Sequence, residues 1–463
     1  MIEKLPKEVL KVIQKIQTAG FEVYVVGGAV RDILMKKSVS DWDFATNAEP
    51  DEIQKIFPES FYDNRFGTVG IAAKYLGNSK SEQIFEITTY RKESDYSDRR
   101  HPDKVLFAKT IQEDLARRDF TINAIALLAD GLLTTDYSKN LVDPFDGQRD
   151  LKAKIVRAVS DPSRRFAEDA LRLLRAVRFS TQLGFVIEPA TFEAIKVNAP
   201  LIQKISGERI RDELLKILAS NYPADGFWIL RNSGLLKEIL PELENCFGIE
   251  QKSPGRHHIY DVGTHSIKSL EACPSRDPLV RFATLLHDIG KPATCGQDEK
   301  GTITFYNHEI IGAHLAKGIA NRLAFSKKDR ELLVTLVRWH QFTVDEATTT
   351  AAVRRFIRRI GVENIGDMID LRVGDRLGGG LKEATSWRLR RFMKMIEKEL
   401  HPPFAVRDLA VDGHDVMEIL GIAPGPEVGK VLAELFEEIE EGKEKNDRNA
   451  LLERLSQIKK AME

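Results

Sequence analysis

The chain has 463 residues, of which 42% are hydrophobic and 30% are charged, and its formal net charge is −1. This composition is ordinary for a folded protein, and the length predicts roughly two to four domains. A net charge this close to zero excludes binding to nucleic acid through overall charge alone, and no apolar run approaches the roughly 20 residues that span a bilayer. Three scattered cysteines, Cys246, Cys273 and Cys295, form neither a metal-binding spacing nor a disulfide framework, so we expect a cytoplasmic protein.

The first predicted elements are an amphipathic helix that ends at Gly20 and a mixed α/β region over residues 21–145. In that region the runs FEVYVV, TVGIAAKYL and IFEITTY are rich in β-branched and aromatic residues, which predicts strands. Gly27 and Gly28 follow the first of these strands. Glycine lets the backbone approach a ligand closely, and the next helix can present its first amides to a triphosphate, with Arg31 one turn along to pair with a phosphate oxygen.

The sequence DWDF places two acids one residue apart in a predicted strand. Residues i and i+2 of a strand share a face, so Asp41 and Asp43 project together and the two aromatic residues point to the buried side. Close carboxylates repel each other unless a cation lies between them, and carboxylate oxygens suit Mg²⁺. With a third acid at Glu86, the set fits nucleotidyl transfer assisted by two metal ions, although DWDF alone is more often an ordinary edge strand.

From about residue 151 the pattern becomes almost wholly helical, with apolar residues three and four apart. The segment EDALRLLR at 168–175 is predicted to be helical, and an acid and three arginines recur every third residue along one side. A carboxylate only accepts hydrogen bonds and a guanidinium only donates them. A pair of one aspartate and one arginine therefore fits the exocyclic amine and the adjacent ring nitrogen of cytosine and adenine. Uracil and guanine present the inverse pattern, and each mismatch costs about 1–3 kcal/mol. The acid and the three arginines are Asp169, Arg172, Arg175 and Arg178. Without the motifs that precede this segment, the pattern would indicate a surface helix with salt bridges.

Histidines are concentrated in the middle of the chain, where seven of the ten lie between residues 257 and 340. This unevenness marks a separate helical unit. Neutral imidazoles mixed with carboxylates favour Mn²⁺, Co²⁺, Ni²⁺, Fe²⁺ or Zn²⁺ over Mg²⁺ alone. The candidate ligands occur in the order His265, His287, Asp288 and Asp375.

Local basic clusters lie at residues 354–359 and 388–394 of this otherwise neutral chain. Such clusters contact phosphates in some proteins and are solvated helix faces in others, and the sequence leaves both alternatives open.

The glycine pair of GGAVRD and the acids of DWDF, a dozen residues apart, resemble the nucleotidyltransferase superfamily of DNA polymerase β. GGAVRD specifically is similar to the eubacterial-type family of bacterial tRNA nucleotidyltransferases and poly(A) polymerases. The segments DLARRDFTINAIA (114–126), VDPFDGQRDL (142–151) and RFAEDALRLLRAVRF (165–179) match successive motifs of that family in order. The resemblance covers most of residues 20–220.

This resemblance implies an enzyme that adds the 3′-terminal CCA to the acceptor arm of tRNA from CTP and ATP, without a nucleic-acid template. Poly(A) polymerase and an A-adding enzyme remain alternatives. Residues 93–102 match a loop that family members need to add the terminal A, which argues against a CC-only enzyme. Asp41, Asp43 and Glu86 would be catalytic, with Mg²⁺ on the two aspartates, and the resemblance assigns the choice of base to Asp169 and Arg172. The nucleotide would contact Gly27, Gly28, Arg31, Arg117, Arg118, Asp119, Asp169, Arg172, Arg175 and Arg178.

The order H…HD…D resembles the HD phosphohydrolase superfamily. The match implies that His265, His287, Asp288 and Asp375 hold a divalent transition metal, and that Lys291 faces a phosphate. Three further histidines could extend the site to a second metal, namely His308, His314 and His340. A different class of function also follows from this match, a metal-dependent phosphohydrolase whose N-terminal half only binds RNA or nucleotide.

The expected fold is α+β, with a polymerase-β-like nucleotidyltransferase domain of a small mixed sheet and helices, followed by an all-α remainder. We expect a catalytic head at 1–150, a helical neck that selects the nucleobase and binds RNA at 151–250, an HD domain at 251–380 and a helical C-terminal body at 381–463. No membrane association is expected, and the sequence leaves the oligomeric state open.

Overall fold

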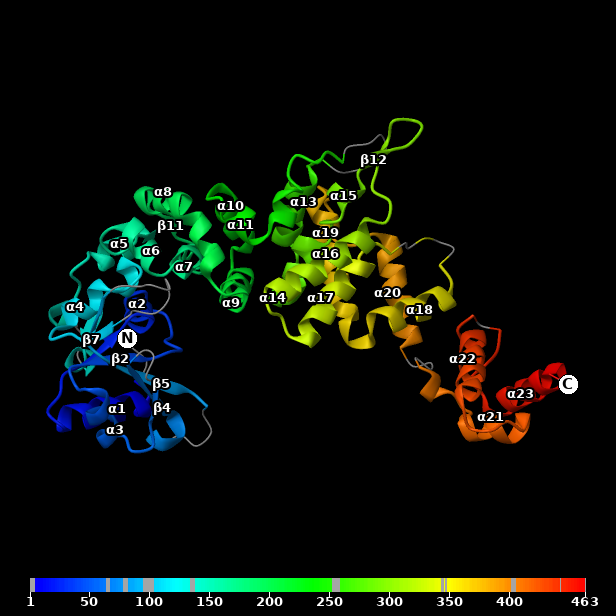
Figure 1. Ribbon diagram of the computed structural model, residues 1–463, viewed down its shortest axis with the longest axis horizontal. Helices are drawn as coiled ribbons and strands as arrows, with labels where there is room; N and C mark the ends of the chain where they lie inside the picture. The colour runs from blue at the N-terminus through cyan, green and yellow to red at the C-terminus, as the bar shows by residue number, and fades with distance from the viewer. Residues whose placement is uncertain are drawn as a thin grey trace. The chain divides into compact units, whose positions relative to one another are not determined.

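The computed structural model describes the chain in two compact units, Met1–Glu244 and Asn245–Glu463 (Figure 1). In the part of the chain that is described, no helix is long and apolar enough to cross a membrane. The predicted loop at 93–102 falls largely outside this part. The described residues are 5–63, 67–77, 82–94, 104–133, 138–251, 259–342, 345, 348–400, 405–441 and 443–462.

The first unit is built on a seven-stranded mixed sheet in the order β3-β4-β5-β2-β1-β8-β9. Strands β2 and β5 run parallel, and the other neighbours in the sheet run antiparallel. A separate two-stranded ribbon joins β6 and β7. The strands are β1 (Val23–Val26), β2 (Asp43–Thr46), β3 (Phe61–Asp63), β4 (Thr68–Ala72), β5 (Ile84–Thr89), β6 (Arg91–Ser94), β7 (Lys104–Phe107), β8 (Ala126–Leu128) and β9 (Leu141–Val142).

Two cores form on the two faces of this sheet. Trp42 and Phe44 are buried with the apolar stripe of helix α1, as the alternation in DWDF predicts. Ala45, next along β2, packs in the other core beside Leu115 of α4. Asp43 therefore lies on the α4 side of the sheet, at the open end of the strand. The helices here are α1 (Lys7–Thr18), α2 (Gly28–Leu34), α3 (Pro50–Ile56) and α4 (Ile111–Ala116).

Helices make up most of the rest of the first unit, interrupted by one short parallel pair of strands, β10 and β11. The prediction of one helix through residues 168–175 is wrong. Asp169 has extended backbone angles and ends α6, and its carboxylate accepts a hydrogen bond from Leu171 N, at the start of α7, at 3.0 Å. The elements are α5 (Gly147–Ala153), β10 (Ile155–Val156), α6 (Pro162–Glu168), α7 (Leu171–Leu183), β11 (Val186–Ile187), α8 (Pro189–Asn198), α9 (Gly207–Leu218), α10 (Pro223–Asn232), α11 (Leu235–Ile239) and α12 (Pro241–Glu244).

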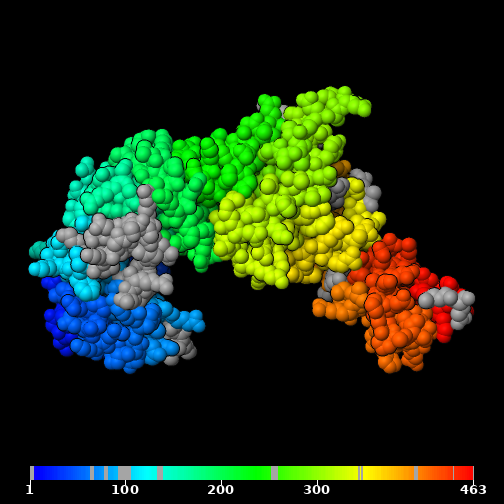
Figure 2. All heavy atoms as spheres, viewed as in Figure 1, coloured from blue at the N-terminus to red at the C-terminus, as the bar shows by residue number. Residues whose placement is uncertain are grey.

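The second unit is almost entirely helical, with α13, α14, α16, α17 and α19 packed on one another. A small hairpin of β12 and β13 projects from this unit (Figure 2). The elements are α13 (Val262–Ala272), α14 (Pro278–Leu286), α15 (Lys291–Thr294), β12 (Gly296–Gln297), β13 (Ile303–Thr304), α16 (His308–Arg322), α17 (Lys327–Trp339), α18 (Thr350–Ile360), α19 (Ile365–Gly378), α20 (Trp387–Glu399), α21 (Gly413–Leu420), α22 (Pro426–Glu440) and α23 (Arg448–Met462).

Candidate functional site

A cavity of about 1030 Å³ opens in the first unit, between the sheet and the helices α7 and α9. All the residues predicted for nucleotidyl transfer line it. They are Gly27, Gly28, Arg31, Asp41, Asp43, Glu86, Arg117, Arg118, Asp119, Asp169, Arg172, Arg175 and Arg178.

Two of the three predicted carboxylates lie on neighbouring strands, and Asp41 lies just before β2, which begins only at Asp43 and does not include the whole of DWDF as predicted. In the parallel pair of β2 and β5, Asp43 is directly opposite Glu86, and Asp41 lies two residues before Asp43. Burial raises the pKa of the Asp43 carboxyl; Arg118 opposes this rise and Asp41 adds to it. Three acids that face one cavity are therefore electrostatically unfavourable without a cation, which fits a divalent metal.

Gly27 brings the backbone close to these charges. Its φ of +68° is in the left-handed region, which favours glycine. A Cβ atom at this position would lie 3.0 Å from Arg118 Nη1 and 3.5 Å from Asp43 Oδ2. Any larger residue would push the arginine away from the carboxylate, so the glycine is required by both conformation and space.

Asp114 anchors two of the cavity arginines, a role that sequence reasoning missed. Its fully buried carboxylate accepts hydrogen bonds from Arg117 Nε at 2.9 Å and Arg118 Nη2 at 3.2 Å. Burial raises the pKa of Asp114, but the two arginines outweigh burial and the pKa is lowered. The signal was present in DLARRD, because an acid three and four residues before arginines on a helix meets both of them.

A second buried acid, Asp119, holds Arg175 of α7 against the sheet domain. The Arg175 Nη2 to Asp119 Oδ2 distance is 2.6 Å, and this pairing lowers the pKa of Asp119 against the effect of burial. Arg178, one turn further along α7, pairs with Glu213 of α9 at 3.0 Å. Both arginines thus form ion pairs that join packed elements, and both side chains also line the cavity.

Asp169 and Arg172, the predicted base-selecting pair, are held by separate partners. Arg209 of α9 approaches the Asp169 carboxylate at 3.4 Å. Arg172 Nη1 donates to Glu168 at 2.9 Å, and its Nη2 donates to the carbonyl oxygen of Arg117 at 3.2 Å. Glu168 and Arg209 were missed by sequence reasoning, and both fix the positions of the pair at the cavity wall.

A second site lies in the second unit, where four side chains from three helical segments converge. His265 Nε2 on α13 lies 3.2 Å from His287 Nε2, 3.5 Å from Asp288 Oδ2 and 3.2 Å from Asp375 Oδ1 on α19. His287 Nε2 is 3.2 Å from Asp288 Oδ2. Burial lowers the pKa of His287, but Asp288 and Asp375 outweigh burial and raise it to about 10. The buried carboxylates therefore favour a cation among these ligands.

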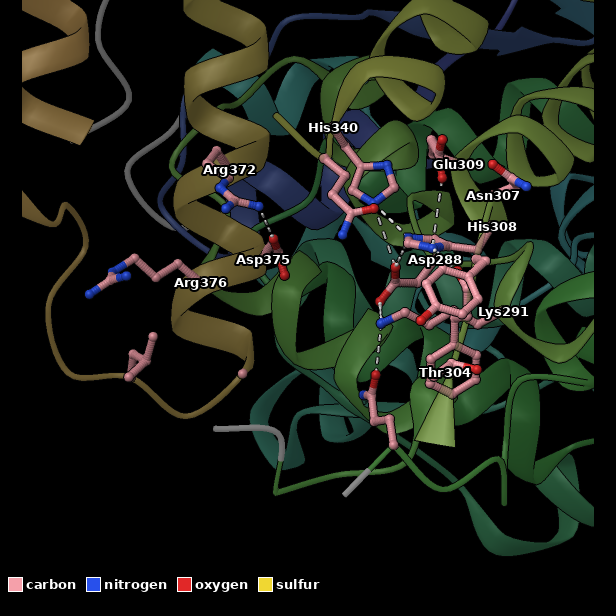
Figure 3. A pocket seen from close by; sticks show the side chains of 16 residues that line it. Asp288, Lys291, Thr304, Asn307, His308, Glu309, His340, Arg372, Asp375 and Arg376 are labelled. Carbon is pink, nitrogen blue, oxygen red and sulfur yellow. Dashed lines mark hydrogen bonds and ion pairs between the residues drawn. The ribbon is translucent and has the colours of Figure 1, made fainter. Parts of the chain in front are cut away.

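His308 and His340 adjoin this group on the other oxygen of Asp288 (Figure 3). His308 begins α16, and His340 follows the last turn of α17. The prediction that His314 joins them is wrong. His314 is exposed because six helical residues after His308 it points to a different face of α16.

A cavity of about 670 Å³ opens over the second site, lined in part by Asp288, Asp375 and three basic residues. Lys291 Nζ lies 2.5 Å from Asp288 Oδ2, and Arg372 Nη1 lies 3.1 Å from Asp375 Oδ2. Lys291 and Arg372 thus place positive charge beside the imidazoles and carboxylates, whereas Arg376, which also lines the cavity, extends away from Asp288 and the histidines (Figure 3). Such a lining suits a phosphate ester.

Two members of the predicted basic clusters form ion pairs with acids of the same unit. Arg354 Nε lies 2.7 Å from Glu399, and Arg358 Nη1 lies 2.6 Å from Glu440. For these two arginines, the ion pairs with acids of neighbouring helices explain the presence of a positive charge.

Comparison with known proteins gives matches along the whole chain. Four family models match: the Poly A polymerase head domain at residues 23–157, the RNA and SrmB-binding site of polymerase A at 184–247, the HD domain at 257–375 and tRNA nucleotidyltransferase domain 2 at 401–455. The CCA-adding enzyme of Limosilactobacillus fermentum is 32% identical over 99% of this chain and 100% of that protein. The corresponding enzyme of Limosilactobacillus reuteri is 34% identical over 97% of this chain and 96% of its own length.

A solved structure also resembles the whole chain. The CCA-adding enzyme of Bacillus stearothermophilus in complex with CTP is 26% identical, covers 99% of each chain and has a TM-score of 0.70. The fold and the order of parts are thus those of the proteins compared.

Proposed function

The chain belongs to the family of CCA-adding enzymes, and from this premise we propose that it completes the 3′ end of tRNA with C, C and A from CTP and ATP. As a member it is a nucleotidyltransferase. The observation that supports the proposal most directly is the first cavity, which combines paired carboxylates, a glycine turn, anchored arginines and an acid–arginine pair. The acceptor arm of tRNA is the proposed partner, and the cytoplasm the proposed location.

We propose that Asp41, Asp43 and Glu86 hold Mg²⁺. Bound Mg²⁺ would make the 3′-hydroxyl of tRNA a better nucleophile and offset the charge of the departing pyrophosphate. The chain supplies the positioning: Gly27 lets the triphosphate approach the backbone, and Arg117 and Arg118, fixed by Asp114, face its phosphates.

Base choice is proposed for Asp169 and Arg172. The Asp169 carboxylate would accept from the exocyclic amine of cytosine or adenine, and Arg172 would donate to the adjacent ring nitrogen. Arg172 Nη1 is already occupied by Glu168 and by the carbonyl oxygen of Arg165, so the donor for a base would come from the rest of its guanidinium. A prearranged pair of this kind needs no template strand.

The test uses purified protein, each labelled nucleotide, and tRNA that ends before CCA or after CC. The native chain is expected to add CCA and stop, whereas long A tails would indicate poly(A) polymerase and A added only after CC would indicate an A-adding enzyme. In the same assay Asp169→Ala is expected to reduce the preference for CTP and ATP over UTP and GTP by about 10- to 100-fold, the effect of one or two lost hydrogen bonds. Unchanged preference would contradict the role given to Asp169.

A second activity, hydrolysis of phosphate esters, is proposed for the site in the second unit. The observation that favours it is the group of His265, His287, Asp288 and Asp375 beneath a basic cavity, a ligand set that suits a divalent transition metal. Such an ion supplies a metal-bound water of lowered pKa when present. On the protein's side, Arg372, which lies beside Asp375, is placed to hold the phosphate.

The corresponding experiment measures hydrolysis of p-nitrophenyl phosphate and bis-p-nitrophenyl phosphate with Mn²⁺, Co²⁺ or Ni²⁺. Asp375→Asn is expected to lower the rate at least about 100-fold, because it removes a charged ligand. Asp43→Asn, in the other unit, serves as the matched control and is expected to leave hydrolysis unchanged. Equal hydrolysis by the native chain and Asp375→Asn would contradict the proposal.

A further inference from the structure

The ring of Phe179, which follows Arg178 on α7, lies among three guanidinium groups of the first cavity. The distance from the ring centroid to the guanidinium carbon is 4.5 Å for Arg178, 5.4 Å for Arg175 and 5.6 Å for Arg31. These distances are within the range of about 6 Å in which the negative face of an aromatic ring attracts a cation. Arg175 and Arg178 belong to the same helix as the ring, whereas Arg31 belongs to α2. The ring therefore joins α2 to α7.

Three positive charges gathered around one ring repel one another. Burial lowers the pKa of the Arg178 guanidinium, and Glu213 opposes this effect. The positive charges of Arg175 and Arg31 lower the same pKa further. Such a group of cations fits a cavity that receives a negatively charged ligand, because an anion offsets the repulsion.

The acids that pair with these arginines do not explain why the three guanidinium groups meet. Each arginine has a different acid: Arg31 pairs with Asp32 at 2.9 Å, Arg175 with Asp119 at 2.6 Å and Arg178 with Glu213 at 3.0 Å. Phe179 is a neighbour that all three share. In addition, Arg178 Nε is buried and has no hydrogen-bond partner among the described residues, so attraction to the ring face compensates for part of its burial.

The ring itself is held by packing. Phe120, whose side chain is fully buried, meets Phe179 edge to face, with ring centroids 5.7 Å apart and an angle of 77° between the ring planes. Only 7% of Phe179 is exposed, which leaves little of the ring for a nucleobase to stack on. The burial therefore favours a role behind the arginines over a role as a stacking surface for the base.

An aromatic ring can hold a guanidinium group without using up its ability to bind phosphate. A carboxylate in the same place would occupy the N–H donors and neutralise the charge. The ring attracts the plane of the group and leaves those N–H groups that are not in ion pairs able to donate. The three arginines line the same cavity as Gly27 and Gly28, where the triphosphate is proposed to approach the backbone.

We propose that Phe179 is a positioning residue whose ring aligns its three arginine neighbours as one group that binds the triphosphate of CTP or ATP. The inference rests on the proposed nucleotidyl transfer and adds a residue to it. Phe179 acts through the arginines and does not touch the substrate. Because the base is selected by other residues, loss of the ring is expected to weaken the binding of CTP and ATP to the same extent.

The first test uses the full-length chain with Phe179→Leu, which keeps an apolar side chain and removes the aromatic ring. The KM for CTP and for ATP is expected to rise about 10-fold, whereas kcat changes by less than about twofold, because the arginines act in binding. Isothermal titration calorimetry is expected to show a similar loss of affinity for inorganic triphosphate. The preference for CTP and ATP over UTP and GTP is expected to stay the same.

The second test keeps the shape of the side chain and changes only the charge distribution of the ring. Phe179 is replaced by phenylalanine that carries one, two or three ring fluorines, each of which weakens the negative face of the ring. The affinity for inorganic triphosphate is expected to fall stepwise along this series. A ring that served only for packing would give equal affinities. If circular dichroism shows that the leucine variant is unfolded, the fluorinated series decides alone.

Phe185→Leu is the matched control. Phe185 lies directly before β11, is 4% exposed and is not among the residues that line this cavity. Its replacement is expected to leave the affinity for inorganic triphosphate unchanged. Unchanged affinity in a folded Phe179→Leu chain, or equal affinities along the fluorinated series, would overturn the inference. A native chain that binds inorganic triphosphate but adds no nucleotide to tRNA would contradict the proposed function instead, and the effect of Phe179 on triphosphate binding would still decide the inference.

Discussion

Asp43→Asn is expected to lower nucleotide incorporation into tRNA by at least about a thousand-fold, roughly 4 kcal/mol of transition-state stabilisation. The variant keeps the size and hydrogen-bonding capacity of the side chain but removes a charge from the wall that faces Glu86 across the β2–β5 pair. Mg²⁺ binding depends on that charge, whereas tRNA binding is not expected to depend on it. Single-turnover incorporation of labelled CTP, with tRNA affinity measured alongside, tests the expectation.

Asp51→Asn is the matched control, because Asp51 is an exposed acid on α3 of the same unit. It is expected to leave incorporation unchanged. Near-native incorporation by a folded Asp43→Asn protein would remove Asp43 from the catalytic set. A parallel loss of tRNA affinity would point to a structural role instead.

Asp114→Ala is expected to destabilise the chain by about 3–5 kcal/mol and to reduce incorporation as well. The substitution leaves Arg117 and Arg118 without the fully buried carboxylate that now pairs with both, and a broken buried ion pair costs this much. Urea unfolding gives the stability, and the KM for CTP and ATP should rise because the freed arginines no longer face the phosphates. Asp212→Ala, which removes a partly exposed ion pair with Arg211, should change stability by less than about 1 kcal/mol.

The buried acids Asp114 and Asp119 predict that the stability of the fold depends on pH. Pairing with arginines lowers the folded-state pKa of Asp114 and Asp119, so their contribution to stability is complete above the unfolded value of about 3.9. It is lost progressively as the pH falls through the folded-state values. Asp114→Ala should therefore show a weaker acid destabilisation than the native chain, and an identical acid profile would contradict the pairing.

The catalytic strand could be predicted because its pattern is local. A period of two predicted that the aromatic residues of DWDF are buried and that its acids project together; Trp42 and Phe44 are buried, and both acids line one cavity although β2 begins only at Asp43. Glu86 was predicted from its place in a strand, and the parallel register with β2 sets it opposite Asp43. Each of these features depends on a few neighbouring residues.

The features that escaped prediction depend on contacts between distant segments or on a break in a regular pattern. The helical period through 168–175 was uninterrupted in sequence, yet the carboxylate of Asp169 competes for the amide of Leu171 and ends α6. Arg209 lies 40 residues from Asp169, and no local pattern connects them. Similarly, six residues separate His308 from His314, and only the helix phase decides which one faces Asp288.

The break at Asp169 has a consequence for how nucleotide choice can be altered. The carboxylate proposed to face the base also accepts a hydrogen bond from the amide of Leu171, the first residue of α7, and α7 carries Arg172 and Arg175. A substitution at Asp169 therefore removes or changes the hydrogen-bond acceptor for the base. It also alters the start of the helix that positions the arginines of the cavity. In this chain base selection and the positioning of the nucleotide-binding arginines depend on the same residue. Variants designed to accept a new base will therefore also have to restore the start of α7.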